Sequence, residues 1–310
     1  PEAEQPVIAE ILDTLDTQIR QTEALIAKLE TVKQGLLTDL LTRGIDENGQ
    51  LRPPSEEAPE LYKDSQLGPI PTSWEITSLS EIADLYSGTT PSRTKHDRYF
   101  SSVGTLWVKT LDLNEDFLSE TDEKITPVAL RETSCRLHPP GTVLLAMYGG
   151  WEQIGRTSLL EVSATTNQAI TALELRRASC VPEFVLRALQ HGRPRWKAIA
   201  ASTRKDPNIT KSDVASYLIP LPPAPEQRII VARFRTLLSR LELEKASLHQ
   251  LRGIKDGLID DLLTGRVRVT PLLGTAKIPG PPTPDPHRSP VGFRPQVQSS
   301  VERRQNGYQG

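Results

Sequence analysis

The sequence predicts an α+β fold in which one mixed α/β domain lies between two long helices of the coiled-coil type. Three observations support this prediction. A heptad pattern near the N-terminus recurs in the same phase after residue 226. The chain between the two copies contains short strand-like runs, turn residues and one helical stretch. Pro-rich segments stand at the borders of these regions.

The repeated stretch predicts two matching helices. Residues 4–42 correspond without a gap to residues 226–264, and both copies end in a Lys-x-Gly-Leu-Leu/Ile-x-Asp-Leu-Leu-Thr pattern. Alternating steps of four and three separate the positions that would face a partner helix. These positions are Ile8, Leu12, Leu15, Ile19, Thr22, Ile26, Leu29, Lys33, Leu36 and Leu40 in the first copy, and Ile230, Phe234, Leu237, Leu241, Glu244, Leu248, Leu251, Lys255, Leu258 and Leu262 in the second.

Gly35 and Gly257 occupy the same place in the two copies. A glycine inside a helix costs about 1 kcal/mol relative to alanine, so its presence needs an explanation. Either two backbones approach closely at these glycines, which is the favoured interpretation, or the helix ends there in a looser turn.

Breaks in periodicity predict the domain boundaries. Gly68–Pro71 would open the globular domain with stiff backbone before Trp74, and Pro220–Pro225 would close it, because proline ends a strand but is tolerated at the start of a helix. The expected parts are a first long helix over residues 1–44, a linker over 45–67, the globular domain over 68–221, a second long helix over 222–269, and a disordered Pro-rich tail over 270–310.

Inside the globular domain, the pattern predicts short strands followed by a helix. The helix is expected over residues 182–201, with Pro182 suited to its first turn and Pro194 expected to kink or divide it. The strand-like runs cover residues 105–111, 142–148, 158–162, 169–175 and 217–219.

Composition and cysteine usage exclude several protein classes. The formal net charge of -2 gives no global nucleic-acid signal, although a local basic face can still neutralise phosphates. Cys135 and Cys180 lie in separate segments without a second Cys or His at ligand spacing, so neither a disulfide framework nor a zinc site is indicated. We expect a cytoplasmic protein without a membrane partner, because the sequence shows neither a long apolar run nor a secretory signal.

Signatures of the common catalytic sites are missing from the sequence. It contains no Gly-rich phosphate loop, no G-x-S-x-G elbow and no H-E-x-x-H motif. An adenine methyltransferase would show an Asn/Asp-Pro-Pro-aromatic tetrapeptide, which His138–Gly141 and Leu221–Ala224 do not supply. We therefore expect a non-catalytic chain that has no metal ligands and binds no cofactor.

Charge is spread unevenly within the globular domain. Residues 176–211 contain nine basic and two acidic residues, whereas residues 112–123 contain six acidic residues and no Lys or Arg. A basic segment suits contact with DNA phosphates, although a solvated helix face explains the charge count equally well. The candidate DNA-binding cations of this segment are Arg193, Arg195, Lys197, Arg204, Lys205 and Lys211.

Two loops add further candidates for contact with a duplex. Residues 92–99 place Arg93, Lys95 and Arg98 in a turn-rich stretch, where they could contact guanine edges or phosphates. Residues 148–153 follow a predicted strand and offer Tyr148, the flexible backbone of Gly149, and Gln153, whose amide can pair with adenine. The competing interpretation is an ordinary glycine turn with Trp151 packed inward. Residues 165–168 could contact phosphate, but a structural turn is favoured.

Taken together, several segments resemble the specificity subunit of type I restriction-modification systems. Each segment is a weak signal alone, but their order and the helix repeat at either side make the resemblance specific over residues 4–269. The matching segments are Gly68–Pro71 with Trp74, Ser87–Pro91, Gly141–Leu145, Thr165–Ile170, Ile219–Gln227 and the two helix ends described above.

The resemblance implies a role in recognition rather than in chemistry. In that family a target recognition domain reads one half of a bipartite DNA sequence, and the long helices set the half-site distance and dock modification subunits. The implied partners are double-stranded DNA, a methyltransferase subunit that binds S-adenosylmethionine, and a restriction motor subunit.

This chain departs from the family pattern because it has two helices but one recognition domain. It therefore resembles the C-terminal half of a subunit, or a half-sized subunit that pairs with a second copy or another half-subunit. The alternative from another class is a coiled-coil scaffold whose middle domain binds protein.

Overall fold

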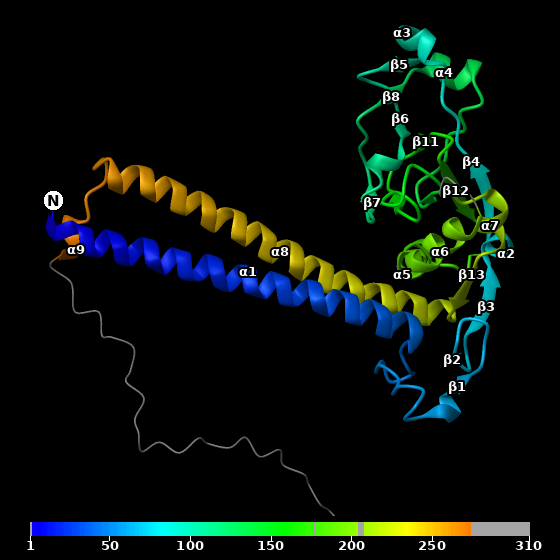
Figure 1. Ribbon diagram of the computed structural model, residues 1–310, viewed down its shortest axis with the longest axis horizontal. Coiled ribbons are helices and arrows are strands. Elements are labelled where there is room, and N and C mark those ends of the chain that lie inside the picture. The colour runs from blue at the N-terminus through cyan, green and yellow to red at the C-terminus, as the bar shows by residue number, and fades with distance from the viewer. Residues whose placement is uncertain (1, 177, 204–207, 274–310) are drawn as a thin grey trace, which may run out of the picture. The chain divides into compact units, whose positions relative to one another are not determined.

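The computed structural model describes residues 2–176, 178–203 and 208–273 (Figure 1). Contacts divide the chain into two compact units, one formed by residues 17–253 and the other by the segments on either side of that range. In the part of the chain that the structure describes, no helix has the length and apolarity needed to cross a membrane.

The two long helices are α1 (Gln5–Thr42) and α8 (Ala224–Leu263). Every predicted heptad position is buried or half-buried in both helices, so the predicted heptad seams are confirmed. Within residues 17–253 the helices run antiparallel, because Glu23 pairs with Arg252 at 2.7 Å and Glu30 pairs with Lys245 at 3.1 Å.

Neither interpretation of the repeated glycines is correct. A Cβ added at Gly35 or Gly257 would meet nothing within 4 Å, so no backbone approaches closely at either position. Both helices also continue past these glycines, to Thr42 and Leu263, because the apolar seam on either side of each glycine still packs.

Glu226, in the first turn of α8, holds the end of α1. Its carboxylate accepts a hydrogen bond from the backbone N–H of Ile45 at 2.8 Å and pairs with both terminal nitrogens of Arg52, at 2.5 and 3.2 Å. The side chains of Arg52 and Glu226 are only 13% and 10% exposed. Gly44 turns with φ of +64°, and a Cβ there would lie 2.3 Å from the Glu226 carboxylate and 2.4 Å from Trp74. This glycine is required both by its backbone conformation and by the crowding around it.

The following residue, Gln227, fastens the start of α8 to the globular body. Its side-chain amide donates to the backbone oxygens of Ser179 and Pro222, and its carbonyl oxygen accepts from the N–H of Val181 at 2.8 Å. The first copy of the repeat has a related contact in the other unit, where the Glu4 carboxylate accepts from Arg268 at 3.0 Å and from the Thr270 hydroxyl.

The globular body contains a five-stranded and a four-stranded sheet. The orders are β4-β12-β9-β10-β7 and β11-β6-β8-β5, with parallel pairing only between β10 and β7 and between β11 and β6. The strands are β4 (Ala83–Ser87), β5 (Phe100–Ser101), β6 (Thr105–Val108), β7 (Phe117–Leu118), β8 (Lys124–Ile125), β9 (Val143–Ala146), β10 (Thr157–Leu160), β11 (Ala164–Thr166) and β12 (Ile170–Leu175).

Shorter elements complete the body. Two antiparallel pairs join β1 (Tyr62–Lys63) to β2 (Ile70–Pro71) and β3 (Glu75–Ser78) to β13 (Leu218–Leu221). The helices are α2 (Leu79–Ile82), α3 (His96–Tyr99), α4 (Pro127–Glu132), α5 (Pro182–His191), α6 (Arg193–Thr203) and α7 (Lys211–Ser216), and the 3-10 turns are η2 (Pro59–Leu61), η3 (Arg93–Lys95) and η4 (Thr110–Asp112).

The five-stranded sheet is buried on both faces, which explains why β9 is a continuous apolar run. Val143 and Leu145 face the main core, which also contains α5, α6 and the ends of both long helices. Leu144 and Ala146 face a second core that includes residues of β6 and β11 from the four-stranded sheet. The helices, the five-stranded sheet and the four-stranded sheet are therefore successive layers.

Most predicted elements inside the domain are confirmed, with shorter ends. The four predicted runs between residues 105 and 175 overlap β6, β9, β10 and β12, and the predicted helix is divided into α5 and α6. The break falls at Gly192, where a Cβ would lie 2.0 Å from the Tyr217 hydroxyl. Pro194 occupies the first turn of α6, where its missing N–H costs nothing.

Two predicted boundary regions differ from the structure. The segment predicted as a linker packs against the body, because Ile45 belongs to the main core and Arg52 is paired with Glu226. The predicted disordered tail starts too early, since α9 (Thr270–Leu273) is helical and follows the buried Val269. The rest of that tail lies outside the described residues.

We expect Glu226→Gln to lower the free energy of unfolding by about 2 kcal/mol, because the largely buried Arg52 loses the carboxylate that pairs with it. Urea denaturation followed by circular dichroism measures this change. Glu242→Gln is the control on the same helix: its carboxylate is exposed and pairs at 3.5 Å with Lys245, so we expect less than about 0.5 kcal/mol. Equal effects of the two variants would contradict the role given to Glu226.

We expect ionisation of Tyr217 to destabilise the fold at alkaline pH. Burial raises the pKa of its phenol to about 12, and its hydroxyl donates to the Gly192 carbonyl at 3.0 Å. Because the folded-state pKa lies above the unfolded value of about 10, the stabilisation is complete below pH 10 and is lost as pH rises toward 12.

Urea denaturation between pH 8 and about pH 11.5 should therefore show wild type losing on the order of 1–2 kcal/mol more than Tyr217→Phe. The variant itself should cost about 1 kcal/mol at pH 8, through the lost hydrogen bond. Parallel pH profiles for the two proteins would exclude Tyr217 as the titrating group.

Candidate nucleic-acid interface

Residues 88–90, which follow β4, are hydrogen-bonded to residues 166–168 at the end of β11, and these bonds link the two sheets. The N–H of Thr89 donates to the Thr166 carbonyl at 2.8 Å, and the hydroxyl of Thr90 bonds to the Gln168 side chain. Gly88 has no room for a side chain, because a Cβ would lie 2.1 Å from the Asn167 carbonyl. Thr165 and Thr166 are buried in the strand β11, and the expected structural turn follows them, where the N–H of Ile170 donates to the Asn167 carbonyl at 3.1 Å.

The first group of predicted contact residues lies in η3 and α3, beside the four-stranded sheet. The guanidinium of Arg93 stacks over the Phe100 ring at 4.3 Å and pairs with Glu123. Arg98 pairs with Glu132, and its Nε donates at 2.8 Å. Lys95 is exposed, with its ammonium 5.8 Å from the Tyr99 ring centroid. The structure thus fixes both arginines by ion pairs and leaves Lys95 with the freest cation of the three.

Glu123 joins Arg93 to Lys109, a residue that sequence reasoning did not select. The ammonium of Lys109 lies 2.8 Å from the carboxylate that Arg93 also contacts. Hydrogen bonds from Arg93 and Lys109 outweigh partial burial and hold the pKa of Glu123 at about 2. The carboxylate therefore stays ionised at neutral pH and sets the position of both cations.

A second group of predicted residues lies in the loop that follows β9. Tyr148 is half-buried against the main core, and Gly149 and Gly150 have φ values of +121° and +100°. The loop closes into a turn because the N–H groups of Gln153 and Ile154 both donate to the Gly150 carbonyl, at 2.9 and 3.1 Å. Trp151 is 45% exposed at the tip, so the interpretation with this ring packed inward is wrong.

Gln153 has only part of its amide available for base contact. Its carbonyl oxygen accepts from Arg156 at 3.0 Å, and Arg156 also donates to the backbone oxygen of Leu113. Bidentate pairing with adenine needs both the amide oxygen and the amide nitrogen. Contact through the nitrogen alone fits the present geometry, and the bidentate contact requires release from Arg156.

Arg193 anchors this loop. Its guanidinium donates to the backbone oxygens of Glu152 at 2.7 Å and Ile154 at 3.3 Å, and pairs with the carboxylate of Glu115. Lys197, one turn further along α6, lies 4.0 Å from the Glu152 carboxylate. Gly155 packs against Arg193 and the Trp196 ring, where a Cβ would be only 3.1–3.2 Å away. Arg193 is therefore a positioning residue for the loop.

The buried side chain of Arg187 contacts both Glu115 and its neighbour Asp116. Arg187 is only 3% exposed; it donates to the Glu115 carbonyl at 3.2 Å and pairs with Asp116 at 2.8 Å and with Glu183 at 3.2 Å. Glu183 also pairs with Arg235 of α8. Contacts thus continue from α8 through α5 to the loop that follows β9.

Two arginines of the predicted basic segment pair with the acidic stretch. Arg187 and Arg193 pair with Asp116 and Glu115, and outside that stretch Arg176 lies 3.5 Å from Asp84. The charge excess counted along residues 176–211 therefore does not form one free basic face. Arg204 and Lys205 lie outside the described residues.

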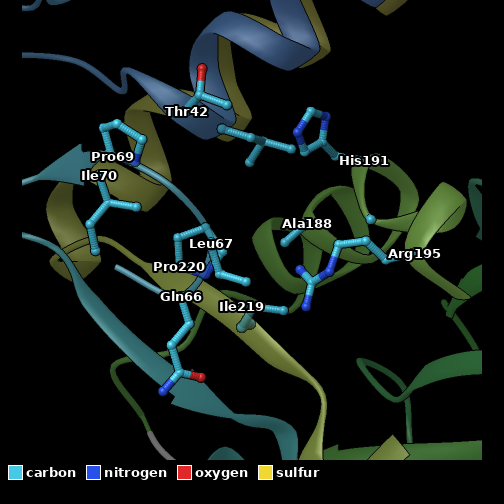
Figure 2. Close-up of a pocket in the computed structure, with 12 residues that line it drawn as sticks. Thr42, Gln66, Leu67, Pro69, Ile70, Ala188, His191, Arg195, Ile219 and Pro220 are labelled. Carbon is cyan, nitrogen blue, oxygen red and sulfur yellow. The ribbon is translucent and has the colours of Figure 1, made fainter. Parts of the chain in front are cut away.

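Arg195 lies apart from the loop and lines a cavity of about 290 Å³. Figure 2 shows it with His191 on one side of this cavity, opposite Pro69 and Ile70. The guanidinium lies over the Tyr217 ring at 4.3 Å and donates to the Leu218 carbonyl at 3.2 Å. Burial lowers the pKa of His191, which favours a neutral imidazole beside this arginine.

The structure thus divides the predicted contact residues. It brings Tyr148, Gly149, Gln153, Arg193 and Lys197 together around one loop, and the Thr110 hydroxyl lies 3.3 Å from a Cβ position at Gly149. Lys109 is the chain neighbour of Thr110. Its ammonium pairs with Glu123, which also pairs with Arg93. Arg195 belongs to the cavity, and Lys211 lies exposed at the start of α7.

Sequence reasoning missed Lys109, Leu111 and Arg156 at this surface. Lys109 and Leu111 stood inside a predicted strand, but β6 ends at Val108 and η4 follows. The Thr-Leu-Asp triplet after Lys109 was an available turn signal, because Asp112 can accept from the N–H of Lys109, as it does at 2.7 Å.

The family model for the type I restriction modification DNA specificity domain matches residues 71–252. The chain belongs to this family. The specificity-domain match covers the globular body and most of α8 within residues 17–253.

Individual members of the family are distant in sequence. The type I restriction enzyme MjaVIII specificity subunit of Methanocaldococcus jannaschii is 24% identical over 290 residues, which cover 87% of this chain and 61% of that protein. The Escherichia coli EcoR124I/EcoR124II specificity subunit is 23% identical over 185 residues, covering 58% of this chain and 45% of that protein. The chain spans about three fifths of the length of the first of these relatives.

Solved structures support the fold assignment. The HsdS subunit from Thermoanaerobacter tengcongensis has a TM-score of 0.55 at 18% identity, over 84% of this chain and 57% of that one. A type I S subunit from M. genitalium has a TM-score of 0.52 at 16% identity, over 83% of this chain and 59% of that one. The predicted α+β domain with two long flanking helices is therefore confirmed as the fold of this family.

We expect Glu123 to contribute stability that depends on acid pH. Its folded-state pKa of about 2 lies below the unfolded value of 4.5, so the contribution is present above pH 4.5 and is lost as pH falls toward 2. After allowance for solvent screening, wild type should exceed Glu123→Gln by about 1 kcal/mol at pH 6, and this difference should shrink by pH 3.

Urea denaturation at pH 6, 4.5 and 3 measures the difference. Glu120→Gln, an exposed carboxylate in the same acidic stretch, should match wild type at each pH. A constant difference between wild type and Glu123→Gln would show that ionisation of this carboxyl is not the cause.

Proposed function

We propose that this chain is the DNA recognition subunit of a type I restriction-modification complex and reads one half of a bipartite target. In this proposal the recognition domain covers residues 68–221, and the chain itself is non-catalytic. The observation that carries the proposal is the anchored loop after β9: Arg193 and Gly150 fix its backbone, while Trp151 is exposed at its tip and Gln153 is half-buried beside it. Fixed loops that project from a rigid double sheet suit base reading.

The helix pair would serve as spacer and docking surface. The exposed apolar side chains of Leu25, Val32 and Leu243 lie on the helices within residues 17–253, outside their shared seam. We propose that this surface docks a methyltransferase subunit. That subunit, rather than this chain, would bind S-adenosylmethionine, flip the target base and transfer the methyl group to it. A restriction motor subunit would join the same cytoplasmic complex.

One recognition domain between two helices leaves the second half-site unread. We propose that a second copy, or another half-subunit, supplies the second reader. Two domains held at a fixed separation gain affinity because the second binding event becomes intramolecular.

A coiled-coil scaffold with a protein-binding middle domain is the second candidate. The observation that favours it is the pairing of Arg93, Arg98 and Arg193 with carboxylates, which reduces the free positive charge of the domain. Such pairs can still exchange partners when a phosphate approaches, since each arginine is partly exposed.

Selection from random duplexes, with and without a candidate methyltransferase subunit, separates the candidates. Enrichment of a bipartite motif in the presence of that subunit supports the recognition role. Protein binding without DNA enrichment supports the scaffold, and methyl transfer by the chain alone would overturn both.

We expect binding of the selected duplex to weaken steeply between 50 and 300 mM salt, because phosphate contacts release counterions. Lys95→Ala and Lys197→Ala should each lower affinity about 5-fold at low salt and reduce the salt slope by about 1. Fluorescence anisotropy over the salt range measures both quantities.

Lys63→Ala is the matched control, since its exposed ammonium lies in β1 and donates to the Thr72 carbonyl at 2.9 Å. It should leave affinity and slope unchanged. Affinity that does not respond to salt would count against duplex binding, and equal losses in all three variants would point to a general charge effect.

A further inference from the structure

Two large apolar side chains are exposed on neighbouring turns of the candidate interface. Leu111 in η4 is 70% exposed, and Trp151 in the loop after β9 is 45% exposed. The turns touch, because the Thr110 hydroxyl lies 3.3 Å from a Cβ position at Gly149. Single exposed apolar residues are common, but a pair on contacting, fixed turns marks a binding surface more specifically.

Both turns hold their apolar residue in a defined place. In η4 the N–H of Lys109 donates to the Asp112 carboxylate at 2.7 Å, and the N–H of Asp112 donates back to the Lys109 carbonyl at 3.0 Å. On the other turn, the Gly150 carbonyl accepts two backbone bonds, and Arg193 holds the carbonyl of Glu152. Leu111 and Trp151 are therefore presented by anchored backbone, so little ordering entropy remains to be lost on binding.

The surroundings of this pair favour a duplex over an apolar protein partner. Lys109 lies directly before η4 and pairs with Glu123, Lys197 lies 4.0 Å from Glu152 beside the Trp151 loop, and Gln153 of the same turn has its carbonyl oxygen bonded to Arg156. In the major groove of B-DNA, the C5-methyl group of thymine is the apolar feature of the base edges, and an amide recognises adenine. The apolar pair matches the thymine half of an A·T pair, and the Gln153 amide would match the adenine half once Arg156 releases its oxygen.

We propose that Leu111 and Trp151 form an apolar contact that reads a thymine methyl group in the DNA half-site. This inference rests on the DNA-reading role proposed above and adds the class of base that the loop selects. Gln153 would hydrogen-bond to the adenine of the same base pair or of the adjacent one, and Lys197 would contact the flanking phosphate.

Replacement of thymine by deoxyuridine tests the contact, because it removes the methyl group and keeps the base pairing. The probe is the duplex enriched in the selection experiment, with each thymine replaced in turn, and the protein is the full chain with its modification subunit. Burial of one methyl group corresponds to about a 4-fold change in affinity. Wild type should therefore lose about 3- to 5-fold at one thymine position of the half-site.

Leu111→Ala and Trp151→Ala should bind thymine and deoxyuridine duplexes about equally at that position. Leu137→Ala is the matched control: its side chain is 48% exposed and precedes His138, which bridges to Ala164 at the start of β11. This variant should keep the wild-type discrimination. Thermal unfolding of all three variants checks that they remain folded.

Several outcomes overturn the proposal. They are a selected half-site without an A·T pair, wild-type binding that ignores every thymine methyl, and discrimination that survives in both variants. Loss of modification-subunit binding with unchanged discrimination would assign Leu111 and Trp151 to a protein contact instead. If the selection enriches no motif, the recognition role fails, whereas an enriched motif without methyl discrimination refutes only the thymine contact.

Discussion

The contact between Glu226 and the end of α1 is the constraint on which the larger unit depends. One carboxylate satisfies the buried N–H of Ile45 and the guanidinium of Arg52, and it leaves space at Gly44 only for a hydrogen atom. The helix pair and the globular body share a core at this point, where Trp74 and Phe234 are buried. The sequence repeat is thus also a repeat of a contact, since Glu4 accepts from Arg268 in the other unit.

The parts of the fold that sequence predicted well are those determined by local periodicity and by proline. Every heptad position identified from the spacing is shielded in α1 and α8, and Pro194 marked the division between α5 and α6. The pairing of strands in two sheets was not predictable, because β11 joins β6 and β10 joins β7 across long stretches of chain. The packing of Ile45 was missed for the same reason, since its partner Glu226 is remote in sequence.

The candidate site shows a different limit of sequence reasoning. A charge count along the chain could not reveal that Glu115 and Asp116 fold against Arg193 and Arg187. Gln153 and the glycines beside it were found because turn chemistry is local. Leu111 was hidden because a strand was predicted to continue through it, whereas the Asp112 side chain ends the strand by capping the backbone of Lys109.

The Arg187 network also limits how recognition domains of this kind can be recombined. Asp116 stands on one side of strands β9 to β12 in the chain, whereas Glu183 and Arg187 stand on the other. A chimaera joined between residues 123 and 176 would take Asp116 and Arg187 from different parents, so the buried Arg187 would keep only its pair with Glu183, at a cost of about 1.5–3 kcal/mol. New specificities that keep residues 112–193 as one exchanged block avoid this cost.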